Sequence, residues 1–126
     1  MRDSLRSALV LLAAALLPAC GTSTPSDGNP PSFSGLASAV PGGAAGEVVL
    51  TWAPGFDESG SVVYDVFQTN AGSGTETLGS PAYQTSATTF TVSGLLTGNH
   101  YWFIVQAQDP SGNVDGNVNE IEVVAP

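Results

Sequence analysis

The sequence almost lacks positive charge. Its only cationic residues, Arg2 and Arg6, lie in the first six positions, and no lysine or arginine follows them. Ten of the 11 acidic residues come after Cys20, which gives this part of the chain a net charge of −10 with His100 neutral. Such a surface repels nucleic-acid phosphates and anionic lipid head groups, so we expect no nucleic-acid partner. Its general consequence is solubility.

The sequence is also poor in catalytic groups. Its single cysteine excludes an intramolecular disulfide, and its single histidine, His100, lies in a turn ("TGNHYW") with no partner visible in the sequence. There is no Gly-x-Ser-x-Gly motif, no His/Cys metal cluster and no phosphate-binding loop. Asp57 and Glu58 are adjacent, but glycoside hydrolysis needs two carboxylates across a cleft. We therefore expect no enzymatic activity and no required cofactor.

No apolar run is long enough to span a bilayer comfortably. The longest, "SALVLLAAALL", has 11 residues, follows the two arginines and ends in "LPAC". This segment resembles a bacterial lipoprotein signal peptide, matching it at Leu17, Ala19 and Cys20, whereas Pro18 departs from the usual small residue. The resemblance implies that the Cys20 sulfur receives a diacylglyceryl group and that cleavage before it makes Cys20 the acylated N-terminus. The alternative is an ordinary secretory peptide with an incidental cysteine.

Two or more acyl chains would hold the protein on a membrane durably. In enterobacterial lipoproteins, an aspartate directly after the lipidated cysteine retains the protein at the inner membrane. Here that position is Gly21, which favours the outer membrane if the same sorting rule applies. Residues 21–32, "GTSTPSDGNPPS", contain no large apolar side chain, which is typical of a flexible tether. The predicted organisation is a signal peptide (1–19), an acylated cysteine with its linker (20–32) and one domain (33–126).

The predicted domain shows only β-strand patterns. Short runs rich in β-branched and aromatic residues are separated by Gly, Pro, Asn and Asp. In "HYWFIVQAQ", for example, Tyr101, Phe103 and Val105 share one face. About seven strands in about 94 residues are typical of one all-β, immunoglobulin-like sandwich. The expected strands are 33–39, 47–52, 62–69, a short one near 75–84, 88–95, 100–108 and 119–125.

Residues 33–126 resemble a fibronectin type III domain. The resemblance depends on Trp52 in "LTW", on Tyr64 and Val66 in "YDV", on "SGL" (93–95) and on "YWFIVQAQD" from Tyr101. It implies that Trp52 fills the core and that Tyr101, at the start of the sixth strand, hydrogen-bonds back across the preceding corner. No Arg-Gly-Asp sequence supports integrin-type adhesion.

One binding hypothesis is a calcium site. In the resembled fold, the loops 54–61 and 109–118 lie at the same end of the sandwich. Calcium takes six to eight oxygen ligands from flexible loops, and a bound cation would relieve clustered negative charge. The alternative is that these residues only form turns. The candidate ligands are Asp57, Glu58, Asp109, Asn113 and Asp115.

A second hypothesis is an exposed aromatic face. If Tyr101, Phe103 and Val105 point inward, alternation directs Trp102 and Ile104 outward, and Val63 and Phe67 project from the neighbouring strand. The four residues Val63, Phe67, Trp102 and Ile104 would then form a partner surface for an envelope protein or a glycan. The alternatives are a covering loop and scattered surface hydrophobes.

These observations predict a lipid-anchored lipoprotein of the bacterial cell envelope that acts as a non-catalytic binding or scaffolding module. The first alternative is a Ca²⁺-binding structural spacer. The second is an accessory module of a surface polysaccharide enzyme system, because similar modules accompany such enzymes.

Overall fold

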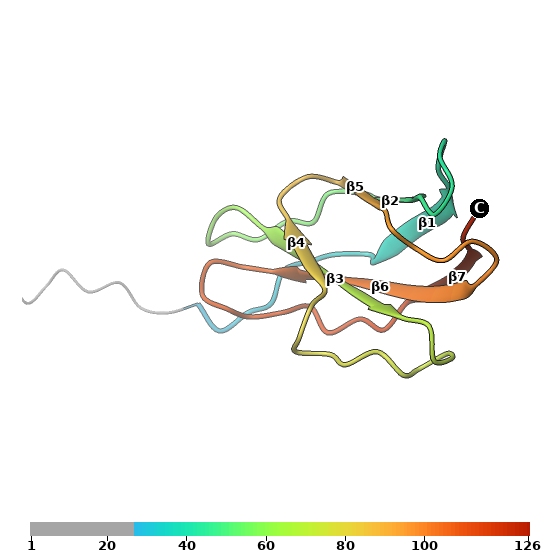
Figure 1. The fold of residues 1–126 in the computed structure, drawn as a ribbon. Coiled ribbons are helices and arrows are strands. Elements are labelled where there is room, and N and C mark those ends of the chain that lie inside the picture. The colour runs from blue at the N-terminus through green and yellow to red at the C-terminus, as the bar shows by residue number, and fades with distance from the viewer. Residues whose placement is uncertain (1–26) are drawn as a thin grey trace, which may run out of the picture.

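A computed structural model describes residues 27–126, which form two antiparallel β-sheets packed face to face (Figure 1). The predicted signal peptide, Cys20 and the linker as far as residue 26 lie outside the described residues. Between residues 27 and 126, no helix has the length and apolar character needed to cross a membrane. The described strands are β1 (Leu36–Pro41), β2 (Val48–Trp52), β3 (Val63–Thr69), β4 (Tyr83–Thr85), β5 (Thr89–Val92), β6 (His100–Gln108) and β7 (Glu120–Val124).

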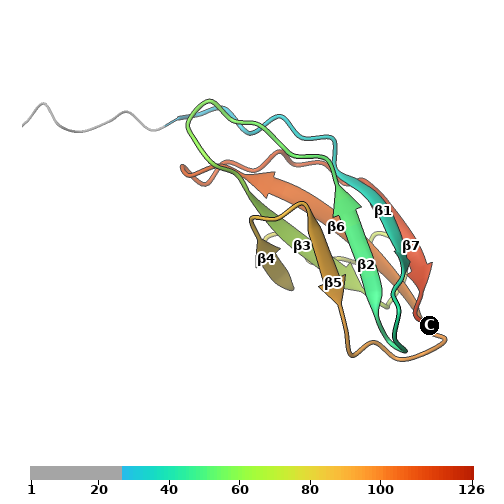
Figure 2. The same ribbon diagram turned by 90° about the horizontal axis from the view of Figure 1, so that it is seen from above.

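The strands form a three-stranded sheet, β1-β2-β5, and a four-stranded sheet, β4-β3-β6-β7. Figure 2 shows the two sheets as facing layers. The predicted all-β class and the predicted strands are confirmed, with most boundaries moved by only a few residues. The largest change is in the predicted strand 75–84, of which only the last part is a strand, since glycine-rich residues 70–82 form a loop.

The core lies between the sheets and follows from strand alternation. In β2, for example, Val48, Leu50 and Trp52 are buried while the residues between them are partly exposed. Strands β3 and β6 pair in register, so Val66 lies opposite Val105 and both fill the interior. The buried cluster comprises Leu36, Val48, Leu50, Trp52, Tyr64, Val66, Val92, Tyr101, Phe103, Val105, Ala107, Val123 and Ala125.

Two aromatic residues take the positions implied by the fibronectin type III resemblance. Trp52 is buried against Tyr64, with ring centroids 5.4 Å apart. The Tyr101 hydroxyl accepts a hydrogen bond from the backbone N–H of Leu96 at 2.9 Å. This bond fastens the turn between β5 and β6 to the start of β6.

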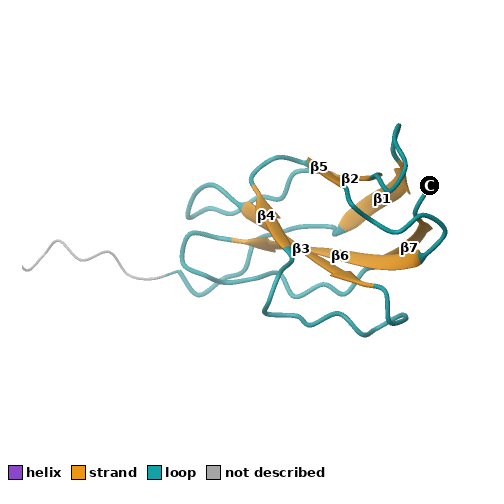
Figure 3. Ribbon diagram, viewed as in Figure 1, coloured by secondary structure: helices purple, strands orange, loops and turns teal. Residues whose placement is uncertain are grey.

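The outer face of the four-stranded sheet is not the open aromatic surface expected from alternation. Phe67 and Ile104 point away from the core as predicted, but they are only 2% and 4% exposed. Long loops run along this side of the sheet (Figure 3), and Leu78 of the 70–82 loop lines pockets together with Phe67 and with Ile104. The expectation of exposure is therefore wrong for these two residues, while Val63 and Trp102 stay partly exposed.

Candidate metal site

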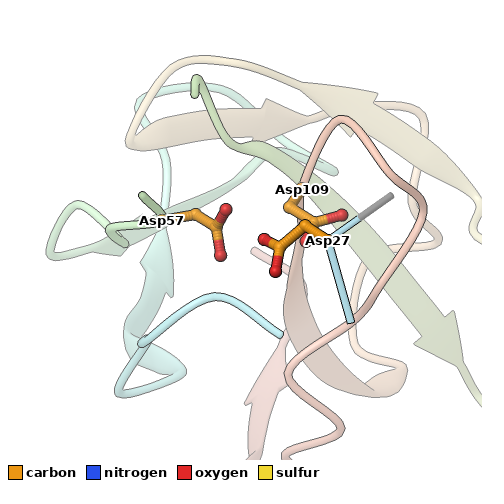
Figure 4. A group of neighbouring side chains, drawn as sticks. All are labelled: Asp27, Asp57 and Asp109. Atoms are coloured by element: carbon orange, nitrogen blue, oxygen red, sulfur yellow. The ribbon is translucent and has the colours of Figure 1, made fainter. Parts of the chain in front are cut away.

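Three carboxylates from distant parts of the sequence meet at one end of the sandwich. Asp27 precedes β1, Asp57 lies between β2 and β3, and Asp109 follows β6. One carboxylate oxygen of each lies within 4.8 Å of those of the other two. Figure 4 shows the three side chains directed toward a common space. The sandwich topology brings the loops of Asp57 and Asp109 to the same end, and the segment before β1 places Asp27 beside them.

Asp109 is held by its own loop, and it is 3% exposed. Its Oδ1 accepts hydrogen bonds from the backbone N–H groups of Ser111 at 2.9 Å and Asn113 at 2.8 Å. Its Oδ2 accepts one from Asn113 Nδ2 at 2.8 Å. Burial alone would raise the pKa of Asp109, but these hydrogen bonds outweigh it and lower the pKa below its ordinary value of 3.8. Asp109 is therefore an anion at neutral pH.

Asp57 is 8% exposed and is oriented by the turn that follows it. Its Oδ2 accepts hydrogen bonds from the backbone N–H of Ser59, at 2.9 Å, and from the Ser59 hydroxyl. Such Asx-type bonds are local and depend only on sequence separation. They fix the carboxylate on the side of the loop that faces Asp109.

Asp27 is the member of the cluster that the sequence prediction missed. Its backbone N–H donates to Ser111 Oγ at 3.3 Å, and its carbonyl accepts from Asn113 Nδ2 at 2.7 Å. Its Oδ1 accepts from the backbone N–H of Asn29 at 3.0 Å. Its Oδ2 is buried, yet no donor among the described residues reaches that oxygen. A buried carboxylate oxygen without a donor is costly unless another group compensates it.

The predicted flexible linker therefore needs correction at its C-terminal end. Residues 27–32 contact the domain: Asp27 bonds to the 109–118 loop, Pro31 is buried, and Ser32 forms a β-bridge with Phe56. The absence of large apolar side chains suggested a free tether. Pro stiffens an extended segment, and that segment finds backbone partners in the loop before β3.

Only two of the five predicted ligands, Asp57 and Asp109, belong to the cluster. Asn113 lies beside it, but its side chain directs the amide nitrogen, which donates hydrogen bonds and cannot bind a cation, toward Asp109 Oδ2 and the Asp27 carbonyl. Glu58 is exposed. Asp115 is committed elsewhere, because its Oδ1 accepts from Ala107 N at 2.8 Å and its Oδ2 from Asn117 Nδ2 at 2.7 Å.

The arrangement of oxygens suits a hard divalent cation. Calcium binds oxygens at 2.3–2.6 Å, so two ligands of one ion are at most about 5 Å apart. The 4.8 Å limit within the cluster meets that condition. No lysine or arginine beyond Arg6 exists to neutralise the three carboxylates. Backbone carbonyls and water would complete the coordination.

Trp102, a partly exposed residue of the predicted aromatic face, lies near the start of β6, whereas Asp109 follows the end of that strand. Trp102 stacks with His100 at a centroid distance of 6.2 Å, and His100 Nδ1 lies 2.6 Å from Glu122 Oε2. The side chains of His100 and Glu122 are about half exposed, at 56% and 46%. Exposed pairs of this kind contribute little to stability.

Comparisons with known proteins agree with the architecture. No protein-family model matches the chain. The chain is 35% identical over 107 residues to chitinase A1 of Niallia circulans, a match that covers 85% of this chain but only 14% of the chitinase. The present sequence thus corresponds to a small part of that relative's length.

Solved structures resemble the whole sandwich. A fibronectin type III-like protein from Clostridium thermocellum superimposes with a TM-score of 0.59 and 26% identity, covering 78% of this chain and 96% of that one. The domain of human fibronectin type III domain containing protein 3 superimposes with a TM-score of 0.53 and 23% identity, covering 83% and 92%. The fold is therefore fibronectin type III-like.

Proposed function

We propose that this chain is a non-catalytic spacer module of a bacterial cell-envelope lipoprotein, in which Ca²⁺ fastens the segment after the lipidated cysteine to the sandwich. The observation that carries the proposal is the convergence of Asp27, Asp57 and Asp109, with the Asp27 Oδ2 atom buried and without a donor among the described residues. We favour this spacer role over binding through the predicted aromatic face, because two of the four residues of that face, Phe67 and Ile104, are buried.

The mechanical consequence follows from the place of Asp27 in the chain. Only six residues separate it from Cys20, and six extended residues span roughly 20 Å. A cation shared by Asp27 and the two loop carboxylates would strengthen the attachment that residues 27–32 already make to the domain, and would keep the free tether limited to residues 21–26. The sandwich would then stand close to the membrane surface with its orientation restricted, because release of Asp27 from the two loops would lengthen the tether.

Thermal unfolding of the mature chain tests the calcium site. When free Ca²⁺ is at a hundred times its Kd, linkage predicts a Tm roughly 10–20 °C higher than the Tm measured with a chelator present. Asp57→Asn should abolish most of this increase. The matched control is Glu58→Gln, which removes the neighbouring, exposed carboxylate and should keep the full response. An unchanged wild-type Tm in Ca²⁺ would refute the site.

The lipid anchor is tested separately. Mass spectrometry of the protein from its native host should find Cys20 as the first residue, carrying a diacylglyceryl thioether. Cys20→Ser should release the protein from the membrane fraction. A mature chain that begins elsewhere, or that carries a free thiol at Cys20, would contradict the anchoring.

A second candidate function has one specific observation in its favour. The 35% identity to a segment of chitinase A1 supports an accessory role beside a polysaccharide-degrading enzyme. Trp102 is then the side chain for a sugar ring to stack upon, because it is the partly exposed tryptophan of β6. Cosedimentation with insoluble chitin, lost in Trp102→Ala and kept in Phe56→Ala, would support it. Wild-type protein that stays in solution would exclude chitin as the ligand.

A further inference from the structure

A pocket on the outer side of the four-stranded sheet combines two carboxylates with an apolar wall. It has a volume of about 250 Å³ and lies between the 70–82 loop and strands β6 and β7. Ile104 forms part of its buried wall, and Leu78 and Val118, which are 44% and 64% exposed, supply further apolar surface. The two acidic lining residues are Glu76 from the loop and Glu120 from β7.

The two acids differ in how they are satisfied. Glu120 is held in place, since its Oε1 accepts from the Ser73 hydroxyl and its Oε2 accepts from the Gly74 backbone N–H at 2.7 Å. Glu76 Oε1 is buried, and no described residue donates a hydrogen bond to it. The pocket therefore offers one fixed carboxylate, that of Glu120, and one buried oxygen of Glu76 that accepts no hydrogen bond from a donor group of the described residues.

The surroundings of Glu76, a partly exposed residue, raise the pKa of its carboxyl group. Burial raises the pKa of Glu76 most, and Glu120 raises it further through a side-chain hydrogen bond between the two acids and through its negative charge. Hydrogen bonds from Ser73 and Gly74 lower the pKa of Glu120. Among the described residues that line the pocket, Glu76 and Glu120 are the two that titrate. A bound cation would stabilise both as anions.

We propose that this pocket binds a lysine side chain of a partner protein. The apolar wall formed by Ile104, Leu78 and Val118 would pack against the methylene stem, and the ammonium group would donate to Glu76 and Glu120. Charge complementarity supports an external source, because this chain has no lysine and its two arginines lie in the first six residues. A compact charge with three donors suits two separate carboxylates better than the planar fork of arginine does.

The test titrates small amino-acid amides into the mature protein. The solution contains a chelator, so that the outcome is independent of calcium. Amide resonances are followed by NMR during titration with Nα-acetyl-lysine amide and with Nα-acetyl-norleucine amide, which keeps an apolar stem but lacks the ammonium group. Saturable shifts at Ile104 and Val118 are expected for the lysine probe alone. Glu76→Gln should weaken this binding about tenfold, whereas Glu47→Gln, on the opposite side of the fold before β2, should leave it unchanged.

The pH dependence provides a second readout. Protonation of Glu76 removes a charge from the pocket, so lysine-probe affinity should rise from pH 4 to pH 7 in the wild type, and this rise should be smaller in Glu76→Gln. Equal shifts with the norleucine probe, tighter binding of Nα-acetyl-arginine amide, or binding unaffected by Glu76→Gln would each overturn the proposal.

Discussion

Phe67 of β3 and Ile104 of β6 lie directly opposite each other on the outer face of the four-stranded sheet, and both are buried. They belong to a second apolar layer, outside the main core, which the 70–82 loop covers. The loop is therefore part of the folded structure and not only a connection between β3 and β4.

Phe67→Ala tests this second layer. Because Phe67 is 2% exposed, the substitution should destabilise the domain by about 3–5 kcal/mol. Phe56→Ala is the control, since Phe56 is 70% exposed and should cost far less. Chemical denaturation measures both free energies of unfolding. Similar small losses in the two variants would mean that the loop does not protect Phe67 in solution.

Asp27→Asn should change the Tm in opposite directions with and without calcium. In a chelator, removing one of three close negative charges relieves repulsion and should raise the Tm. In saturating Ca²⁺, the same change removes a ligand and should lower the Tm below that of the wild type. Thermal scans under both conditions decide the matter. A shift of the same sign in both would assign Asp27 a role without a metal.

Acid should weaken the domain through Asp109. Its folded pKa lies below its ordinary value of 3.8, so the ionised form stabilises the fold. That contribution is complete above the unfolded pKa and is lost as the pH falls through the folded pKa. In a chelator, the Tm difference between wild type and Asp109→Asn should therefore shrink as the pH falls below about 4. A difference that stays constant down to pH 2 would contradict this assignment.

Tyr101→Phe should destabilise the domain by about 0.5–1.5 kcal/mol, because the corner between β5 and β6 loses the acceptor for the Leu96 N–H. The aromatic ring and its packing remain. Tyr83→Phe is the comparison, since Tyr83 lies in the short strand β4 at a partly exposed position and should lose less. Chemical denaturation of both variants gives the difference. Equal losses would show that the corner hydrogen bond has no special weight.

Much of the fold was predictable because strand alternation and turn residues are local signals. The run His100–Gln108 has the same bounds in the prediction and in the structure. The burial of Trp52 in the core and the hydrogen bond of the Tyr101 hydroxyl to the preceding corner also match the expectation from the family resemblance. The short strand β4 was placed too early, because the residues 70–82 contain no periodicity that reports where pairing with β3 begins.

The site was predicted only in part. Asp57 and Asp109 were predictable because the topology brings their loops to one end. Asp27 was not, since nothing local in "SDGNPP" shows that this segment contacts Ser111 and Asn113, more than eighty positions away. Glu76 and Glu120 escaped for the same reason, as they are paired only by the course of a loop.

By itself, the sequence determined the charge, the strand pattern and the face on which each strand side chain lies, because these depend on composition and on a period of two residues. Only the tertiary structure decided which outward faces are covered and which acids meet. Those outcomes depend on the path of three long segments, 27–35, 70–82 and 109–119, whose contacts are made with residues distant in the chain.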